Sequence, residues 1–219
     1  IQPAVASAPV PDGAERSARA RSLWDAAVDP RGTLVERYLQ GRGLVLPDEA
    51  SGRAIRFLAD CPWKTTNDTV IKVAAMVCAM VDVNTNELRA VHRTALTSDG
   101  QKIGKKMLGP VAGTVIKLSP DEDVSIGLGI CEGVENGLAV LQKGWRPVWA
   151  LGSAGAIRTF EVLPGIDTLT VFGDHDQAGR EAARVVSERW QRAGVECVIR
   201  LPKDGGTDWN DAVRHGRAA

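Results

Sequence analysis

The sequence predicts an α/β protein, in which a parallel-strand-rich sheet flanked by helices follows a smaller mixed α+β lobe. In the C-terminal half, apolar runs alternate with helical patterns, which favours a parallel sheet covered by helices. In the N-terminal half, the long apolar stretch at 70–83 turns back into the strand-like run at 88–96, as in a hairpin. We therefore expect a linker-like N-terminus at 1–15, a lobe at 16–122 and the α/β domain at 123–219.

The predicted lobe follows a segment with the composition of a linker. Residues 2–13 are rich in Pro, Ala and Ser, and the chain starts at Ile1 rather than at methionine. We therefore expect the chain to be an excised piece of a longer protein. Further on, residues 33–43 carry Leu34 and Tyr38 at helical spacing, which predicts a helix that packs through these side chains.

Basic residues cluster after the predicted hairpin. Residues 82–87 predict the turn, and Lys102, Lys105 and Lys106 lie ahead of a further strand at 114–118. Such cations can hold nucleic acid or a nucleotide against a site that is otherwise acidic. The alternative is that they form the solvated edge of a hairpin.

The α/β domain begins with a strand that ends at an acid. The apolar run at 125–131 stops at Glu132, and Gly133 then allows a tight turn into a helix. Ligands of open α/β sheets bind at the carboxyl ends of strands, so Glu132 is placed for chemistry. Glu135, one turn into the helix, is expected to be a solvated or capping acid, and the alternative is that it contacts metal or substrate.

A second strand of this domain ends in two acids, Asp174 and Asp176, which follow an apolar run at 169–172. Side chains at i and i+2 of an extended backbone point to the same side, so both carboxylates can reach one hard cation such as Mg²⁺. Gly179 lets the next helix start close to the strand end. A turn followed by a helix N-cap would use the same residues.

The rest of the domain continues the alternation and adds a further acid. The remaining predicted elements are a strand at 147–151, helices at 154–160 and 178–193, and a strand at 195–201. Asp208 lies in the loop after the last strand, where it could complete a metal site or act as a helix N-cap.

The motif Glu132-Gly133-Val134-Glu135-Asn136, followed by Asp174-His175-Asp176-Gln177-Ala178-Gly179, resembles the paired signature of the Toprim domain. Primases of the DnaG type, phage and plasmid primase-helicases, type IA and II topoisomerases and some nucleases share this domain. The resemblance covers about residues 124–215. It implies Mg²⁺ or Mn²⁺ bound by the four acids, with Glu132 as general base or metal ligand in phosphoryl transfer; these acids are Glu132, Asp174, Asp176 and Asp208.

The lobe before this domain is similar to the one that precedes Toprim in DnaG-type primases. Arg93, Lys106 and Lys117 match that family's arginine and two lysines, and Lys105 stands beside Lys106. The segments around Arg93 and Lys106 are more similar still to the phage and plasmid members. The resemblance implies that these four cations bind nucleic acid or nucleotide.

The function implied is that of a DNA primase catalytic core, a nucleotidyltransferase of DNA replication that makes RNA primers on single-stranded DNA from nucleoside triphosphates. A replicative helicase or a zinc-binding domain outside this chain would be a further partner. The alternatives are a metal-dependent Toprim nuclease that uses water as nucleophile and a non-catalytic nucleic-acid-binding module. A topoisomerase is disfavoured because the only tyrosine, Tyr38, is expected on a packing face.

Composition restricts the remaining choices. The chain has 27 basic and 27 acidic residues and a formal net charge of zero, so any contact with nucleic acid must be local. No apolar run approaches the roughly 18 residues of a membrane span. The four cysteines are scattered and form no Cys-x-x-Cys pair, which is typical of a protein in a reducing cytoplasm, here that of a bacterial host of a mobile element.

Overall fold

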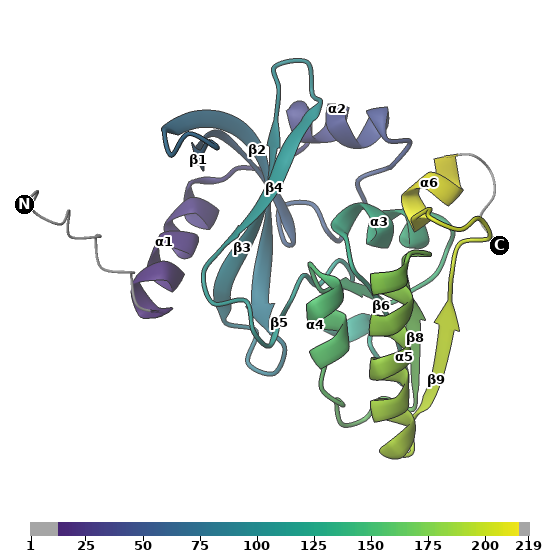
Figure 1. The fold of residues 1–219 in the computed structure, drawn as a ribbon. Helices are drawn as coiled ribbons and strands as arrows, with labels where there is room; N and C mark the ends of the chain where they lie inside the picture. Colours follow the sequence, from purple (N-terminus) through teal and green to yellow (C-terminus); the bar gives the residue numbers. More distant parts are fainter. Residues whose placement is uncertain (1–12, 215–219) are drawn as a thin grey trace, which may run out of the picture.

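The computed structural model describes residues 13–214, which form two β-sheets with helices packed around them (Figure 1). In chain order the elements are α1 (Gly13–Ala26), α2 (Leu34–Gly41), β1 (Ile55–Lys64), β2 (Val70–Asp82), β3 (Leu88–Leu96), β4 (Lys102–Leu108), β5 (Thr114–Val115), the 3₁₀ turn η1 (Asp121–Asp123), β6 (Gly127–Cys131), α3 (Val134–Gln142), β7 (Val148–Ala150), α4 (Ala154–Thr159), β8 (Thr168–Phe172), α5 (Gln177–Arg192), β9 (Glu196–Arg200) and α6 (Trp209–Arg214).

The N-terminal lobe is built on an antiparallel sheet with strand order β1-β2-β3-β4, and β5 pairs with β2. Successive side chains of a strand point to opposite faces of its sheet. Along β2, Ala75 and Val77 therefore pack in the cluster under α1, whereas Met76 and Cys78 pack in the cluster that contains α2. The lobe thus has one face covered by α1 and another that faces α2 and the C-terminal domain.

The C-terminal domain is a parallel sheet with strand order β7-β6-β8-β9. Both faces are covered, as a parallel sheet requires. Helices α4 and α5 bury Ile157 and Trp190 against one face, and α3 and α6 bury Leu138 and Trp209 against the other. In Figure 1 the pair α4 and α5 stands in front of the sheet, with α3 and α6 above it.

One apolar core joins the two parts. Tyr38 of α2 and Met80 of β2 belong to the same buried cluster as Leu138, Phe172 and Trp209 of the C-terminal domain. Because the carboxyl ends of β6 and β8 lie beside this cluster, the position of the N-terminal lobe is fixed next to the strand ends that carry the predicted acids.

The predicted fold class is confirmed, with an antiparallel lobe preceding a parallel sheet and its helices. Most expected elements are present within a few residues, and β3 has the expected bounds, although the strand expected at 114–118 is only the two-residue β5. The expected linker at 1–15 lies mostly outside the described residues, and α1 begins at Gly13. No helix in the described part of the chain is long and apolar enough to cross a membrane.

Candidate active site

Three of the four predicted acids line one cavity at the carboxyl edge of the parallel sheet. Glu132 directly follows β6, and Asp174 comes two residues after β8, which is the neighbouring strand. Asp208 reaches the same cavity from the residue before α6. The cavity has a volume of about 90 Å³. The expectation that separate strand ends deliver carboxylates to one place is therefore met by the geometry.

These carboxylates disfavour one another's ionised form. Burial, together with the charges of Glu132, Asp208 and Asp176, raises the pKa of Asp174 to about 7. Burial also raises the pKa of Glu132, and Asp176 adds to this effect while Lys105 opposes it. Burial likewise raises the pKa of Asp208. The cavity therefore holds more negative charge than its own side chains can neutralise.

Asp176 lies at the exposed rim of this site and also caps a helix. Its Oδ1 accepts a hydrogen bond of 2.7 Å from the backbone N–H of Gly179 at the start of α5. The two interpretations of the motif, N-cap and acid beside Asp174, thus apply to the same side chain. Gly179 is required there because a Cβ at this residue would lie 2.5 Å from the carbonyl oxygen of Asp174.

A hydrogen-bond network holds Asp174 in place. The Nδ2 of Asn136 in α3 donates to Asp174 Oδ1 over 2.7 Å, and the backbone N–H of Asn210 donates to Asn136 Oδ1 over 3.2 Å. Arg42, which follows α2, donates from Nε to Asn210 Oδ1 over 2.6 Å. Residues of both lobes thus orient one carboxylate. Sequence reasoning missed this network, for which Asn136, the last residue of the Glu132 motif, was the local signal.

Two lysines of β4 face the acidic cavity. The Nζ of Lys105 lies 3.8 Å from Glu132 Oε1, and the Nζ of Lys102 lies 3.1 Å from Glu135 Oε1. The hydroxyl of Tyr38 donates to the same oxygen of Glu135 over 2.6 Å. Burial opposes ionisation of Glu135, but Lys102 and Tyr38 outweigh it and hold its pKa at about 2. Glu135 is therefore not the solvated acid that was expected, since it is buried and ion-paired, although it also accepts a hydrogen bond from its own backbone N–H in the first turn of α3, as a capping acid does.

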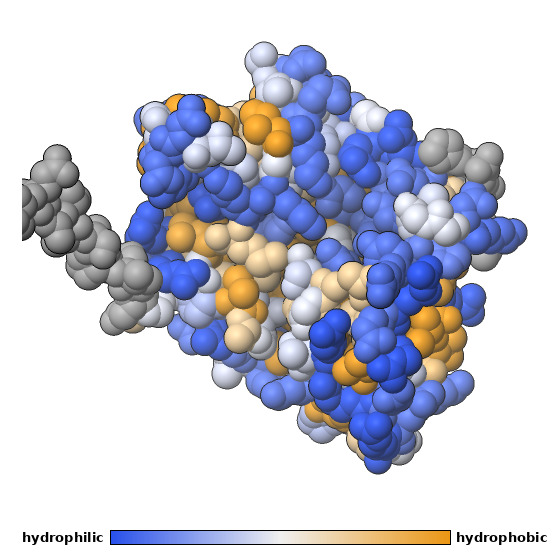
Figure 2. All heavy atoms as spheres, in the orientation of Figure 1, coloured by the Kyte–Doolittle hydropathy of each residue, from blue (hydrophilic) through white to orange (hydrophobic). Residues whose placement is uncertain are grey.

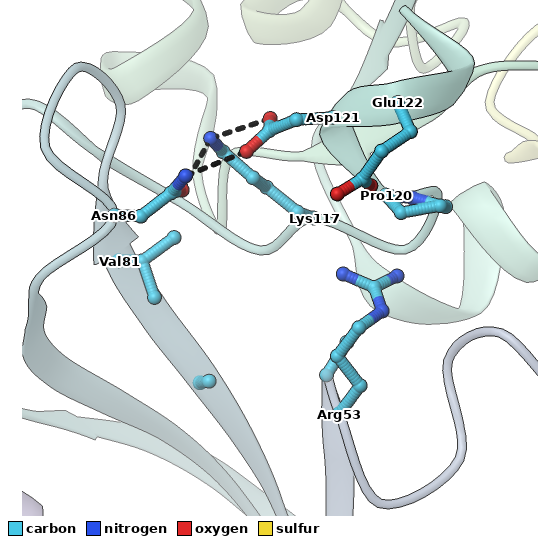
Figure 3. A pocket seen from close by; sticks show the side chains of 9 residues that line it. Arg53, Val81, Asn86, Lys117, Pro120, Asp121 and Glu122 are labelled. Carbon is cyan, nitrogen blue, oxygen red and sulfur yellow. Dashed lines mark hydrogen bonds and ion pairs between the residues drawn. The ribbon is translucent and has the colours of Figure 1, made fainter.

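The other predicted cations lie elsewhere. Lys106 lies opposite Arg93 in the register of β3 and β4. Both side chains point to the face of the sheet opposite Lys105. Lys117 is almost buried between the lobes, where its Nζ contacts Asp121 Oδ1 at 2.7 Å and Asn86 Oδ1 at 2.5 Å (Figure 3). Of the four cations, the structure brings only Lys105 together with the acids. A nucleotide contact of Lys117 would have to replace its bond to Asp121.

The donor set suits a hard divalent cation, although the side chains do not form a closed ligand cluster. Among residues 13–214, no three His, Cys, Asp or Glu side chains are grouped closely enough to hold a metal ion. Carboxylate oxygens are nonetheless the ligands that Mg²⁺ prefers, and it uses one or two of them beside water and phosphate oxygens. The raised pKa of Asp174 shows that its ionised form is unfavourable in this cavity, and a bound cation would neutralise that charge.

Two protein families match the two parts of the chain. Residues 127–218 match the Toprim domain, and residues 14–118 match a domain of unknown function (DUF7146). No curated protein matches the sequence.

Solved primase structures share the fold. The primase fragment of the bacteriophage T7 primase-helicase is 18% identical, with 82% of this chain and 70% of that chain covered and a TM-score of 0.55. A DNA primase domain from Pseudomonas aeruginosa is 18% identical, with 93% and 74% covered and a TM-score of 0.59. The DnaG primase catalytic domain bound to single-stranded DNA is 16% identical, with 93% and 76% covered and a TM-score of 0.62. Residues 127–218 are therefore a Toprim domain, in a chain with the fold of DnaG-type and phage primase catalytic cores.

Proposed function

We propose that this chain is the catalytic core of a DNA primase, which joins ribonucleotides on a single-stranded DNA template. The observation that carries the proposal is the shared cavity of Glu132, Asp174 and Asp208 at the sheet edge, within a fold like that of primase cores. The lobe that contributes Lys105 and Lys102 beside these acids favours a polymerising enzyme over a bare Toprim nuclease.

Each side chain has a distinct role in this proposal. Asp174, Asp176 and Asp208 would hold Mg²⁺ or Mn²⁺, and the bound ion would supply neutralising charge for the phosphates. Glu132 would accept the proton of the attacking hydroxyl or share in binding the ion. Lys105 would attract the triphosphate, because its ammonium group lies next to the acids that would otherwise repel it. Asn136 positions Asp174 through its hydrogen bond.

The partners are proposed from the same relatives. One similar structure is a fragment of a primase-helicase and another was solved with single-stranded DNA bound. We propose single-stranded DNA and nucleoside triphosphates as substrates, with a helicase or a zinc-binding domain acting beside this chain. Because the formal net charge is zero, affinity for DNA alone should be weak and should fall with added salt.

One assay separates this function from its alternatives. The protein is incubated with single-stranded template, labelled nucleotides and Mg²⁺ or Mn²⁺, and the products are resolved by size. A primase extends a ribonucleotide chain, a nuclease degrades the template, and a binding module does neither. We expect extension, with Glu132→Gln at least about a hundredfold slower.

The control for this variant is Glu161→Gln, which removes an exposed acid of the same domain. Both variants should keep the thermal unfolding transition of the wild-type protein. Template degradation by the wild type would instead establish the nuclease. Full activity of a folded Glu132→Gln protein would remove Glu132 from the mechanism.

A further inference from the structure

One edge of the parallel sheet is covered and the other is open. At β7, Ile116 forms a bridge with Ala150 and exchanges hydrogen bonds of 2.7 and 2.9 Å with it. At the other end of the strand order, β9 pairs only with β8 in the described part of the chain. An unpaired edge strand exposes a row of backbone donors and acceptors, which another strand can bind. The outer edge of β9 is therefore a candidate interaction surface.

β9 lacks the features that usually protect an edge strand. Its residues, Glu196–Arg200, include no proline or lysine, and their register with β8 contains no bulge. Proline, lysine and bulges are common means by which edge strands avoid pairing. Ile199 is 40% exposed, and Figure 2 shows hydrophobic side chains at the right-hand side of the molecule, where Figure 1 places β9. The edge thus combines unprotected backbone with exposed apolar side chains.

The direction of the backbone groups identifies those that point outwards. The N–H of Glu196 donates to the carbonyl of the residue before β8, and the carbonyl of Arg200 accepts from the N–H of the residue after β8, both over 3.0 Å. Successive residues of a strand direct their N–H and C=O groups alternately to its two sides. The backbone groups of Cys197 and Ile199 therefore point away from β8, towards the open edge.

An antiparallel pairing of two copies of β9 satisfies these outward groups. When a two-fold axis passes beside Val198, Cys197 of each copy lies opposite Ile199 of the other. Residues paired in this way exchange N–H···O=C bonds in both directions. Val198 lies opposite its own counterpart in a pair without hydrogen bonds, where side chains approach most closely. The outer edge of β9 is thus complementary to itself.

The charges at the two ends of β9 match in the same register. Glu196 of each copy lies opposite Arg200 of the other, on the face of the sheet that carries Val198. Both side chains are exposed, and neither forms a salt bridge within the described part of one copy. Glu196 Oε2 accepts from Thr168 Oγ1 over 3.4 Å, and the Arg200 guanidinium lies 4.9 Å from the ring centre of Trp145. An in-register parallel pairing would place like charges opposite each other, so the charges favour the antiparallel one.

We propose that two copies of this chain associate through the outer edges of β9, which joins their parallel sheets into one continuous sheet. The same surface patch is used on both copies, so every contact occurs twice and the assembly closes as a dimer. Because the paired strands are short, the interface is small and the dimer is reversible, with a Kd of about 1–100 μM. The predicted acids lie at the ends of other strands, so this proposal does not rest on the proposed function.

Sedimentation velocity over a range of protein concentrations tests the proposal with two charge variants. In Glu196→Arg both ends of β9 are basic, and in Arg200→Glu both are acidic. Each variant alone should therefore dimerise at least about tenfold more weakly than the wild type. When the two variants are mixed, every basic end lies opposite an acidic one, and association should return to within about threefold of the wild type. The rescue by mixing shows that both variants are folded.

The matched controls are Glu161→Arg and Arg158→Glu, which change the same charges at exposed positions in and beside α4. Alone or mixed, they should dimerise like the wild type. Ile199→Pro removes an outward N–H but no donor of the ladder with β8, so it should prevent dimerisation and keep a cooperative thermal unfolding transition.

A wild type that is still monomeric at about 500 μM would overturn the proposal and leave this edge to a strand of another protein. A wild-type dimer that neither charge variant nor Ile199→Pro weakens would also overturn it, because that dimer would use another surface. Glu132→Gln should dimerise like the wild type, so loss of catalysis and loss of association are separable.

Discussion

Replacing Asp174 by Asn should stabilise the metal-free protein while it removes a proposed metal ligand. The pKa of Asp174 is about 7, against an ordinary value of 3.8, because the carboxyl is buried beside Glu132, Asp208 and Asp176. At pH 8 Asp174 is therefore mostly ionised in the folded protein. Its charge is less favourable there than in the unfolded chain, and this lowers the free energy of unfolding. Asn at this position removes the charge and keeps an oxygen that can accept the hydrogen bond from Asn136.

The expected magnitude follows from the pKa difference. About three pKa units at ~1.4 kcal/mol each correspond to about 4 kcal/mol, and because Asp174 is only partly buried we reduce this to about 2 kcal/mol. For a chain of this size that raises Tm by about 4–8 °C. Since the folded pKa is the higher one, the stability contributed by this group is complete below the unfolded pKa and is lost as pH rises through about 7. The gap between wild type and variant should thus narrow as pH falls from 8 to 4.

Urea unfolding in EDTA at a series of pH values measures this difference. Asp167→Asn is the matched control, since it changes an exposed acid at the opposite end of β8 and should alter stability by less than about 0.5 kcal/mol. Millimolar Mg²⁺ should raise the Tm of the wild type at neutral pH and have little effect on Asp174→Asn. The reasoning is refuted if Asp174→Asn is no more stable than the wild type at pH 8 in EDTA.

Two further predictions concern the buried polar groups behind the site. Tyr38→Phe should lower the free energy of unfolding by about 1–3 kcal/mol, because Glu135 would keep only Lys102 as a side-chain partner; an unchanged urea midpoint would contradict this. His92 is buried and its pKa is lowered to about 4, mainly by burial, from an ordinary value of 6.5. Its contribution to stability is therefore complete above pH 6.5 and lost towards pH 4, by about 3 kcal/mol in total. In urea unfolding, the free energy of unfolding of His92→Gln should not show this decrease between pH 6.5 and pH 4. An equal decrease in both proteins would show that His92 does not cause it.

The strands that the sequence predicts well are those with a strong local pattern. β8 is a short apolar run bounded by turns, and a buried strand of a parallel sheet needs no more than this. β3 belongs to the antiparallel sheet and was predicted from the turn that precedes it.

β1 was not predicted, and β4 was anticipated only in the alternative that Lys102, Lys105 and Lys106 form the solvated edge of a hairpin. β1 has a register shift between Leu58 and Cys61, and β4 is an edge strand with polar side chains on both faces. β4 therefore lacks the period of two that identifies a half-buried strand, whereas the sequence of β1 has this period, with apolar residues at Ile55, Phe57, Cys61 and Trp63, and was missed all the same.

In the site, too, the features that depend on adjacent residues were predictable. The positions of Glu132 and Asp174 could be predicted because strand ends and tight turns are determined by neighbouring residues. The environment of Glu135 was not, because its partners Tyr38 and Lys102 come from distant parts of the chain and meet it only after the lobes pack. A carboxylate in the first turn of a helix is normally solvated, and burial with an ion pair reverses that expectation.

The cations show why a resemblance between sequences cannot assign a face of a sheet. Lys105 and Lys106 are adjacent, so an alignment that is shifted by one residue exchanges them, and a shift of one residue moves a side chain to the opposite face. The register shift between Ala95 and Leu96 is a local irregularity of the kind that single-sequence patterns do not reveal. Lys105 accordingly faces Glu132, and Lys106 joins Arg93 over Trp63. Two neighbouring lysines of one strand therefore lie on two separate surfaces of the sheet, and only the Lys105 side chain is near the predicted acids.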